Sequence, residues 1–314
     1  MTESNILDLS TLEKNHQKII VGNFKEKGTP FITVDFPFIL NIPNIIHYRP
    51  EQTDFPSATE IKKFLDESLE SKTLIISSNV DKSFPTAPYI DLLSHPKLQG
   101  IVTHNPSFLH PKIFSLPLGP KWQMKSTLPF GESKIDRRNI YLENCACNSK
   151  SAFKLFKNKR KSQVWIRPMT QSVGISRNYN SKFSRALIYN RNQIVEVLQK
   201  VSKVVISKKK IAPEEYLQTL QKYRFVVSPH GNGLDAHSTW EALMCGCIPI
   251  VPSSPLNQIY DLLPVWVVKD WTNITDEKII EKEKELLEKV KEKDFELIFE
   301  TGLQKYIQNI SEKK

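Results

Sequence analysis

Short runs of hydrophobic residues alternate with longer amphipathic stretches along most of this chain. In the first half the pattern predicts one helix at 58–69 and strands at Lys18–Val21, 31–34, Thr73–Ser77, 100–103 and 113–116. In the second half it predicts helices at 191–201 and 213–222 and strands at 164–167 and 203–207. Regular alternation of strands and helices indicates an α/β fold built on parallel sheets.

The segment 223–252 has the clearest pattern in the sequence. A buried strand at 223–228 runs into the break Pro229-His230-Gly231-Asn232-Gly233, and a second buried strand is predicted at 247–251. A helix is expected between them, with Asp235 as its N-cap and Gly246 as its C-terminal stop. A glycine-rich turn that opens a helix directs backbone N–H groups and the positive end of the helix dipole toward a bound phosphate. The segment therefore predicts a nucleotide or sugar-phosphate site.

Two familiar glycine-rich sites fit this segment less well. Residues 231–236 match the GxGxxA pattern of dinucleotide-binding proteins, but no carboxylate follows the second strand to bind a ribose hydroxyl. A P-loop is excluded because GxxxxGK[ST] does not occur in the sequence. Glu241, early in the predicted helix, offers a different ribose ligand, and the alternative interpretation is a solvated helix carboxylate.

The stretch FVVSPHGNGLDAHSTWEALMCGCIPIV, residues 225–251, resembles the donor-site signature of the exostosin-like, family-47-type glycosyltransferases and their soluble microbial and viral relatives. The close resemblance covers about 214–275. Upstream, SSNVD at 77–81, THN at 103–105 and LPLG at 116–119 occur in the order that this family shows. The resemblance implies a GT-B fold, in which two Rossmann-like domains face a cleft and the C-terminal domain binds a UDP-sugar. It also implies inversion at the anomeric carbon and no essential metal.

One departure from the family pattern concerns the diphosphate. Where relatives carry His-Arg, this chain has His237-Ser238, so either another cation supplies the charge or activity is reduced. The candidate cations are Arg167, Arg177 and Arg191, and Arg191 is attractive because it begins a predicted helix. The predicted donor site consists of Arg191, Ser228, His230, Gly231, Asn232, Gly233, His237, Ser238, Thr239 and Glu241. No cofactor is expected, and the sequence lacks the D-x-D motif that holds Mn²⁺ in GT-A enzymes.

The catalytic base should follow a parallel strand of the opposite domain, since ligands of α/β sheets bind at the carboxyl ends of the strands. Asp81 and His104 satisfy this condition, and we prefer Asp81 by a small margin. The alternatives are a turn aspartate and a hydrogen-bonded loop histidine. The predicted function is transfer of a xylose, glucuronic acid or galactose-type sugar to a glycan hydroxyl. A degenerate GT-B protein that binds nucleotide sugar or glycan without catalysis is the alternative.

The predicted domains are an acceptor-side Rossmann-like domain at 1–130, a nucleotide-sugar-binding domain at 136–290 and a C-terminal helix at 291–314 that crosses back to the first domain. The polar stretch 121–138 is interpreted as an irregular linker. The stretch 275–300 is predicted to be one helix, because Glu/Lys pairs recur at i,i+4 spacing.

The net charge of +10 suits an anionic substrate but does not identify it. Basic runs at 157–161 and 208–210 lack interleaved aromatic residues, so we expect solvated surface rather than a nucleic-acid site. No signal peptide or membrane-spanning segment is recognisable, so a cytoplasmic location is expected. The expected partners are the sugar donor and the glycan acceptor.

Four cysteines form two C-x-C pairs, Cys145/Cys147 and Cys245/Cys247. Zinc sites favour a wider spacing between paired cysteines, so no metal site is expected. We interpret the four residues as small buried thiols in a reducing compartment.

Overall fold

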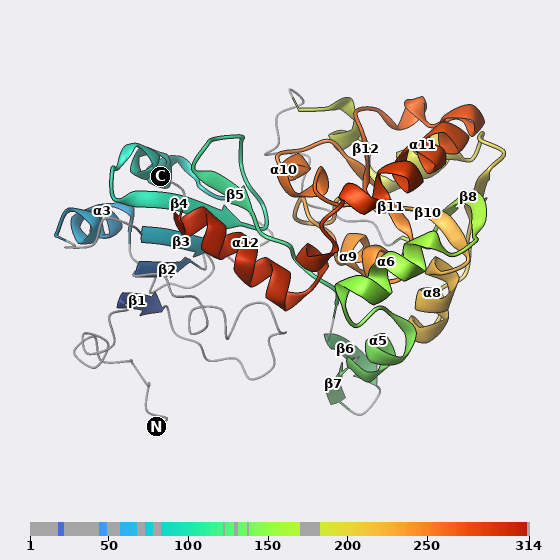
Figure 1. The fold of residues 1–314 in the computed structure, drawn as a ribbon, viewed down its shortest axis with the longest axis horizontal. Helices are drawn as coiled ribbons and strands as arrows, with labels where there is room; N and C mark the ends of the chain where they lie inside the picture. The colour runs from blue at the N-terminus through green and yellow to red at the C-terminus, as the bar shows by residue number, and fades with distance from the viewer. Residues whose placement is uncertain are drawn as a thin grey trace. The chain divides into compact units, whose positions relative to one another are not determined.

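The computed structural model describes residues 18–21, 44–48, 57–67, 73–77, 83–121, 123–128, 131–136, 138–169 and 183–312. The chain divides into two compact units, the first formed by Met1–Leu116 with Leu303–Lys314 and the second by Pro117–Gly302 (Figure 1). The predicted strand at 31–34, the candidate base Asp81 and the candidate cation Arg177 lie outside the described residues.

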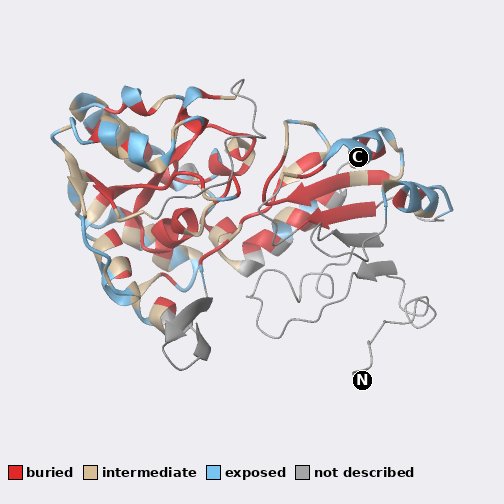
Figure 2. Ribbon diagram, turned by 180° about the vertical axis from the view of Figure 1, so that it is seen from behind, coloured by how far each residue is buried: buried red, intermediate tan, exposed pale blue. Residues whose placement is uncertain are grey.

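The first unit is built on a parallel sheet. Its described strands lie in the order β1 (Lys18–Val21), β2 (Asn44–Tyr48), β3 (Thr73–Ser77), β4 (Leu98–Thr103) and β5 (Ile113–Ser115). Every residue of β3, with the sequence TLIIS, is buried, as expected of a parallel strand that is covered on both faces (Figure 2). A short helix, α4 (Ala87–Ile90), and a 3₁₀ turn, Asp91–Ser94, precede β4.

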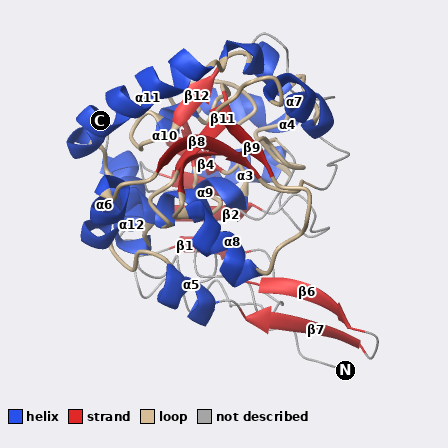
Figure 3. Ribbon diagram, turned by 90° about the vertical axis from the view of Figure 1, so that its right-hand side faces the viewer, coloured by secondary structure: helices blue, strands red, loops and turns tan. Residues whose placement is uncertain are grey.

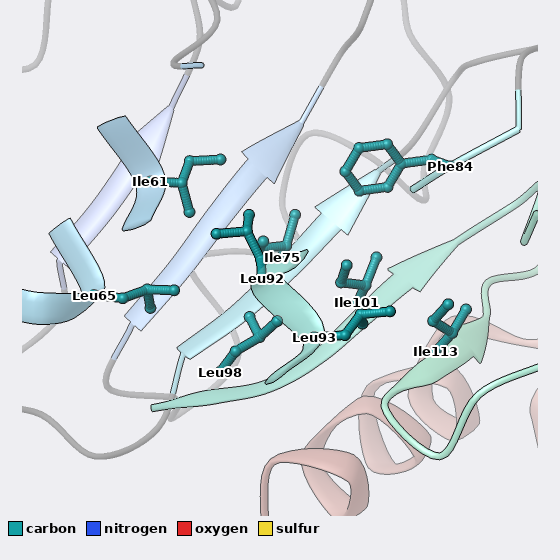
Figure 4. Packing of buried hydrophobic residues seen from close by; sticks show 9 residues of the cluster. All are labelled: Ile61, Leu65, Ile75, Phe84, Leu92, Leu93, Leu98, Ile101 and Ile113. Carbon is teal, nitrogen blue, oxygen red and sulfur yellow. The ribbon is translucent and has the colours of Figure 1, made fainter. Parts of the chain in front are cut away.

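Successive side chains of β3 point to opposite faces of the sheet, and each face has its own hydrophobic cluster. On one face Ile75 packs with Ile61 and Leu65 of α3 (Ala58–Glu67) (Figure 4). On the other face the C-terminal helix α12 (Glu300–Glu312) covers the strands. Its cluster consists of Leu74, Ile76, Val102, Leu116, Leu303, Ile307 and Ile310. The last helix of the sequence therefore completes the core of the first unit.

The second unit is built on another parallel sheet. Its strands lie in the order β12 (Trp266–Val268), β11 (Ile248–Pro252), β10 (Tyr223–Val227), β8 (Lys161–Ile166) and β9 (Val204–Ile206). Its helices are α5 (Arg138–Asn144), α6 (Ser149–Lys157), α7 (Arg191–Leu198), α8 (Pro213–Leu220), α9 (His237–Met244), α10 (Asn257–Tyr260) and α11 (Asp276–Glu288). The predicted α/β fold class with two Rossmann-like parallel sheets is confirmed.

Residues of α5, α8 and α9 pack with β8 and β10 in one cluster of the second unit. The buried members are Tyr141, Trp165, Leu217, Leu220, Val226, Ala242, Met244, Cys245 and Cys247. This packing fixes α9 against the strand from which its loop begins.

The stretch 121–138 is not the irregular linker that its polar composition suggested. It contains an antiparallel hairpin of β6 (Gln123–Leu128) and β7 (Gly131–Asp136) (Figure 3). In the register of this hairpin, Met124 opposite Ile135 is the one pair in which both residues are hydrophobic. The alternation by which a strand is recognised is therefore nearly absent from the sequence.

The predicted single helix at 275–300 is also corrected. The helix α11 ends at Glu288, and 3₁₀ turns at Lys289–Glu292 and Phe295–Ile298 follow. The ring of Phe295 lies 5.7 Å from that of Phe153 and 5.1 Å from that of Phe156, between centroids. Burial of this ring favours a break over continuation of a solvated helix. Among the described residues, no helix combines the length and the apolar character needed to cross a bilayer.

Candidate functional site

The strand order of the second unit contains a switch point between β8 and β10. The chain leaves β8 for β9 on one side, and then builds β10, β11 and β12 outward on the other side. Open α/β sheets bind their ligands at the carboxyl ends of the strands where the order reverses in this way. Arg167 follows β8 at this position, and the loop 228–233 follows β10.

The loop 228–233 begins the connection from β10 to α9 and carries the predicted glycines. The N–H of Gly231 donates to the carbonyl of Gly233 across a distance of 3.1 Å. A Cβ atom at position 231 would lie 3.6 Å from the guanidinium of Arg191, so the loop backbone passes close to a cation. Asn232 is exposed and Gly233 is buried.

Three of the predicted donor ligands are hydroxyl residues that bind one another. The Oγ of Ser228 lies 2.6 Å from the Oγ of Ser238 and 2.9 Å from the Oγ1 of Thr239, and all three residues are buried. These bonds connect the end of β10 to the first turn of α9. The hydroxyl of Ser238 is therefore turned into the protein.

Two arginines and a histidine lie near the switch point. Arg191, the first residue of α7, donates from Nη2 to the carbonyl of His230 at 3.2 Å. Burial lowers the pKa of Arg191, and the nearby charge of Arg167 lowers it further. The guanidinium of Arg167 lies 5.8 Å from the ring centroid of Tyr216, and among the described residues its Nε has no hydrogen-bond partner. The site therefore holds two neighbouring cations, both of them half-buried.

The imidazole of His230 is neutral at pH 7. Burial lowers its pKa to about 4, and the charge of Arg191 acts in the same direction. Its buried Nδ1 has no hydrogen-bond partner within the part of the chain that the structure describes. A neutral imidazole carries one N–H donor, so His230 offers a hydrogen bond rather than a charge.

Asp235 is not the N-cap of α9. The N-cap is Ala236, which makes no side-chain cap, and the carboxylate of Asp235 is buried instead. Its oxygens accept hydrogen bonds from the Nε1 of Trp240 (2.7 Å), the N–H of Ala236 (2.8 Å), the N–H of Leu118 (2.8 Å) and the hydroxyl of Tyr260 (3.0 Å). Burial raises the pKa of Asp235 to about 6, while these four bonds act in the opposite direction.

The start of α9 binds the backbone of the segment 118–121. The carboxylate of Asp235 accepts a hydrogen bond from the N–H of Leu118 (2.8 Å). The Nδ1 of His237 donates to the carbonyl of Gly119 (2.8 Å). The Oε1 of Glu241 accepts from the N–H of Lys121 (3.4 Å). This segment overlaps the LPLG stretch at 116–119. The sequence marked that stretch through the family resemblance but gave no sign that α9 binds it.

Glu241 is buried, so it is not the solvated helix carboxylate of the alternative interpretation. Its Oε1 lies 2.5 Å from the hydroxyl of Tyr141, which belongs to α5. Among the described residues, hydrogen bonds reach only this oxygen of the carboxylate. Tyr141 could not be identified from the sequence, because no local pattern links two residues that lie so far apart in the chain.

His104 belongs to the first unit and directly follows β4. It is buried, and its Nδ1 lies 2.9 Å from the carbonyl oxygen of Leu116. Since a carbonyl can only accept, Nδ1 carries the proton in the neutral imidazole and Nε2 is the basic nitrogen. Asp81, the preferred base, is outside the described residues.

Among the described residues, no three His, Cys, Asp or Glu side chains are grouped so that they could hold a metal ion. The expectation of buried thiols is right for Cys245 and Cys247 and wrong for Cys147, which is exposed, while Cys145 is half-buried.

No protein-family model and no curated protein matches this chain. Solved structures match it along most of its length with little identity. The N-terminal domain of trehalose-6-phosphate phosphatase from Candida albicans is 11% identical, with 88% of this chain and 71% of that chain covered and a TM-score of 0.36. AviGT4, a glycosyltransferase involved in avilamycin A biosynthesis, is 11% identical, with 85% and 83% covered and a TM-score of 0.37. An alpha-glucosyltransferase solved with UDP and a 13-mer DNA is 13% identical, with 84% and 75% covered and a TM-score of 0.30. An activity does not transfer between chains at this level of similarity.

The hydrogen bonds to Asp235 predict a large loss of stability when its carboxylate is removed. Asp235→Ala leaves the Trp240, Tyr260 and Leu118 donors without their acceptor, so we expect the free energy of unfolding to fall by about 3 kcal/mol. Urea denaturation followed by fluorescence measures this change. Asp261→Ala is the matched control, because Asp261 is exposed, and it should change stability by less than about 0.5 kcal/mol. Equal stability of the two variants would contradict the role given to Asp235.

Proposed function

We propose that this chain is an exostosin-like glycosyltransferase of the GT-B type. It moves a sugar from a UDP-sugar to a glycan hydroxyl, with inversion and without an essential metal. The observation that carries the proposal is the position of Arg167 and Arg191 beside the loop 228–233, at the switch point of the second sheet. The xylose, glucuronic acid or galactose type of the donor follows from the family resemblance alone.

The diphosphate of the donor is assigned to the two arginines and the loop. Two cations held close together raise each other's free energy, and a diphosphate between or beside them offsets that cost through charge-assisted hydrogen bonds. The N-terminus of α9 adds backbone N–H groups and the positive end of a helix dipole. Arg191 is our first choice for the cation that replaces the missing arginine at Ser238, since it already contacts the loop at His230.

The remaining donor contacts are assigned by position and chemistry. His230 lies inside the loop and, as a neutral imidazole, donates a hydrogen bond to a phosphate or sugar oxygen. Glu241 follows on the same helix and has a second carboxylate oxygen for a ribose hydroxyl. Ser228, Ser238 and Thr239 support the loop through their mutual hydrogen bonds rather than through direct contact with the donor.

Inverting transfer also needs a base that removes the proton of the acceptor hydroxyl. Asp81 remains our proposal for this base, because a carboxylate after a parallel strand fits the chemistry. The tautomer of His104 supports the second candidate, since the bond to Leu116 leaves Nε2 unprotonated. The burial of His104 weighs against it, since the base must reach the acceptor hydroxyl.

The donor site is tested by comparing UDP with uridine by calorimetry. Arg191→Gln and Arg167→Gln each remove a cation that we assign to the diphosphate. Each should weaken UDP binding about 10- to 100-fold and leave uridine binding unchanged, because charged hydrogen bonds contribute about 1.5–3 kcal/mol. Arg185→Gln is the control with the same change of charge, since the exposed Arg185 pairs with Asp270.

Two results would contradict this site. If uridine and UDP binding fall equally in Arg191→Gln and Arg167→Gln, the arginines support the fold rather than the diphosphate. If all three variants bind UDP as the wild type does, the diphosphate binds elsewhere.

The transfer reaction is tested with UDP-xylose, UDP-glucuronic acid and UDP-galactose, in EDTA and again with Mn²⁺. Asp81→Asn keeps the shape of the side chain and removes its proton acceptor, so transfer should fall roughly 10²–10⁴-fold with UDP affinity within a few-fold of wild type. A wild-type rate in Asp81→Asn together with an inactive His104→Gln would make His104 the base. Activity that requires Mn²⁺ would contradict the metal-free mechanism. UDP binding without transfer or hydrolysis would favour the degenerate binding protein.

A further inference from the structure

The helices α5 and α9, together with the residue that directly follows each of them, make two matching contacts about one helical turn apart. Near their middle, the hydroxyl of Tyr141 meets the carboxylate of Glu241 at 2.5 Å. Four residues further on in each chain segment, the Sγ of Cys145 lies 3.3 Å from the Sγ of Cys245. The N–H groups of both cysteines still bond to the carbonyls of Tyr141 (2.8 Å) and Glu241 (3.1 Å), so each thiol continues the face of its helix.

The two sulfurs are already in contact. A disulfide bond is about 2.05 Å long, so the sulfurs must approach by only about 1.3 Å. Cys145 is half-buried and is the more accessible of the two residues, whereas Cys245 is buried. An accessible thiol backed by a second thiol is the arrangement from which thiol–disulfide exchange proceeds.

The other two cysteines are placed differently, and the structure describes all four. Cys147 is exposed and its Sγ lies beside Asn148 (3.5 Å) and Ser151 (3.9 Å) at the start of α6. Cys247 is buried directly before β11, with its Sγ 3.6 Å from the carbonyl oxygen of Arg224. Cys145 and Cys245 are the pair in contact, although each C-x-C motif offers a nearer partner in sequence.

We propose that Cys145 and Cys245 form a reversible disulfide that fastens α5 to α9. The co-reactant is a low-molecular-weight disulfide of the glutathione type. The Cys145 thiolate attacks one sulfur of this disulfide, forms a mixed disulfide and expels one thiolate. The Cys245 thiolate then attacks the sulfur of Cys145 and expels the second thiolate. Two protein thiols are oxidised, the small disulfide is reduced to two thiols, and these take up the two protons that the cysteines lose.

The order of the steps follows from the environment of each thiol. Burial raises the pKa of Cys245, and its hydrogen bond with Cys145 acts in the same direction, so Cys245 is the weaker first nucleophile. It becomes effective once the mixed disulfide has formed at the sulfur beside it. The disulfide between Cys145 and Cys245 forms one helical turn away from Glu241, so oxidation holds the contact between Tyr141 and Glu241 in place.

The test equilibrates the full folded chain in glutathione buffers of increasing oxidised fraction, followed by alkylation and peptide mass spectrometry. We expect the loss of two thiols, a peptide linked through Cys145 and Cys245, and full recovery of both thiols in dithiothreitol. Cys147→Ser is the matched control and should form the same linked peptide. Cys145→Ser should abolish it.

Oxidation should also raise the midpoint of thermal unfolding in the wild type and in Cys147→Ser, and leave it unchanged in Cys145→Ser. This comparison starts from chains already shown to be folded by circular dichroism, so a folding defect in one variant does not decide the result. Glutathione attached to Cys145 or Cys147 without a linked peptide would overturn the proposal. A link that involves Cys147, or four thiols that stay reduced throughout, would overturn it as well.

Discussion

The buried carboxylate of Asp235 is the interaction on which the candidate site depends. This one carboxylate accepts hydrogen bonds from Ala236 and Trp240 at the start of α9. It also accepts from Tyr260 at the end of α10 and from Leu118 in the segment 118–121. Burial of a carboxylate is costly, and the raised pKa of about 6 reflects that cost. Four donors offset it, so the start of α9 and the end of its glycine loop have one defined position.

The candidate site then separates into supporting residues and binding residues. Ser228, Ser238 and Thr239 use their hydroxyl groups on each other, and His237 binds the carbonyl of a neighbouring segment. The supporting contacts fix the loop without supplying charge. The charge comes from α7 and the end of β8, where Arg191 and Arg167 lie near the switch point. Ser238 therefore belongs to the supporting residues, and the cations come from other elements.

Much of the fold could be predicted because hydrophobic pattern and turn chemistry are local. The strand β3 and the glycine stop at Gly246, whose φ is +68°, follow from a few adjacent residues. Contacts between distant segments could not be predicted. Aspartate is a residue type that favours the N-cap position, and only tertiary packing turns the side chain of Asp235 inward. The bond between Tyr141 and Glu241 has no local signature, and the hairpin β6–β7 lacks a hydrophobic alternation.

The central claim is that a nucleoside diphosphate binds at the switch point of the second sheet. Hydrogen–deuterium exchange of the full chain, with and without saturating UDP, tests it most directly. The account predicts slower exchange in peptides from 190–198 and 228–241, and no change in peptides from 276–288. Unchanged exchange in the first two regions, with protection confined to parts of the second unit other than 161–169, would contradict it.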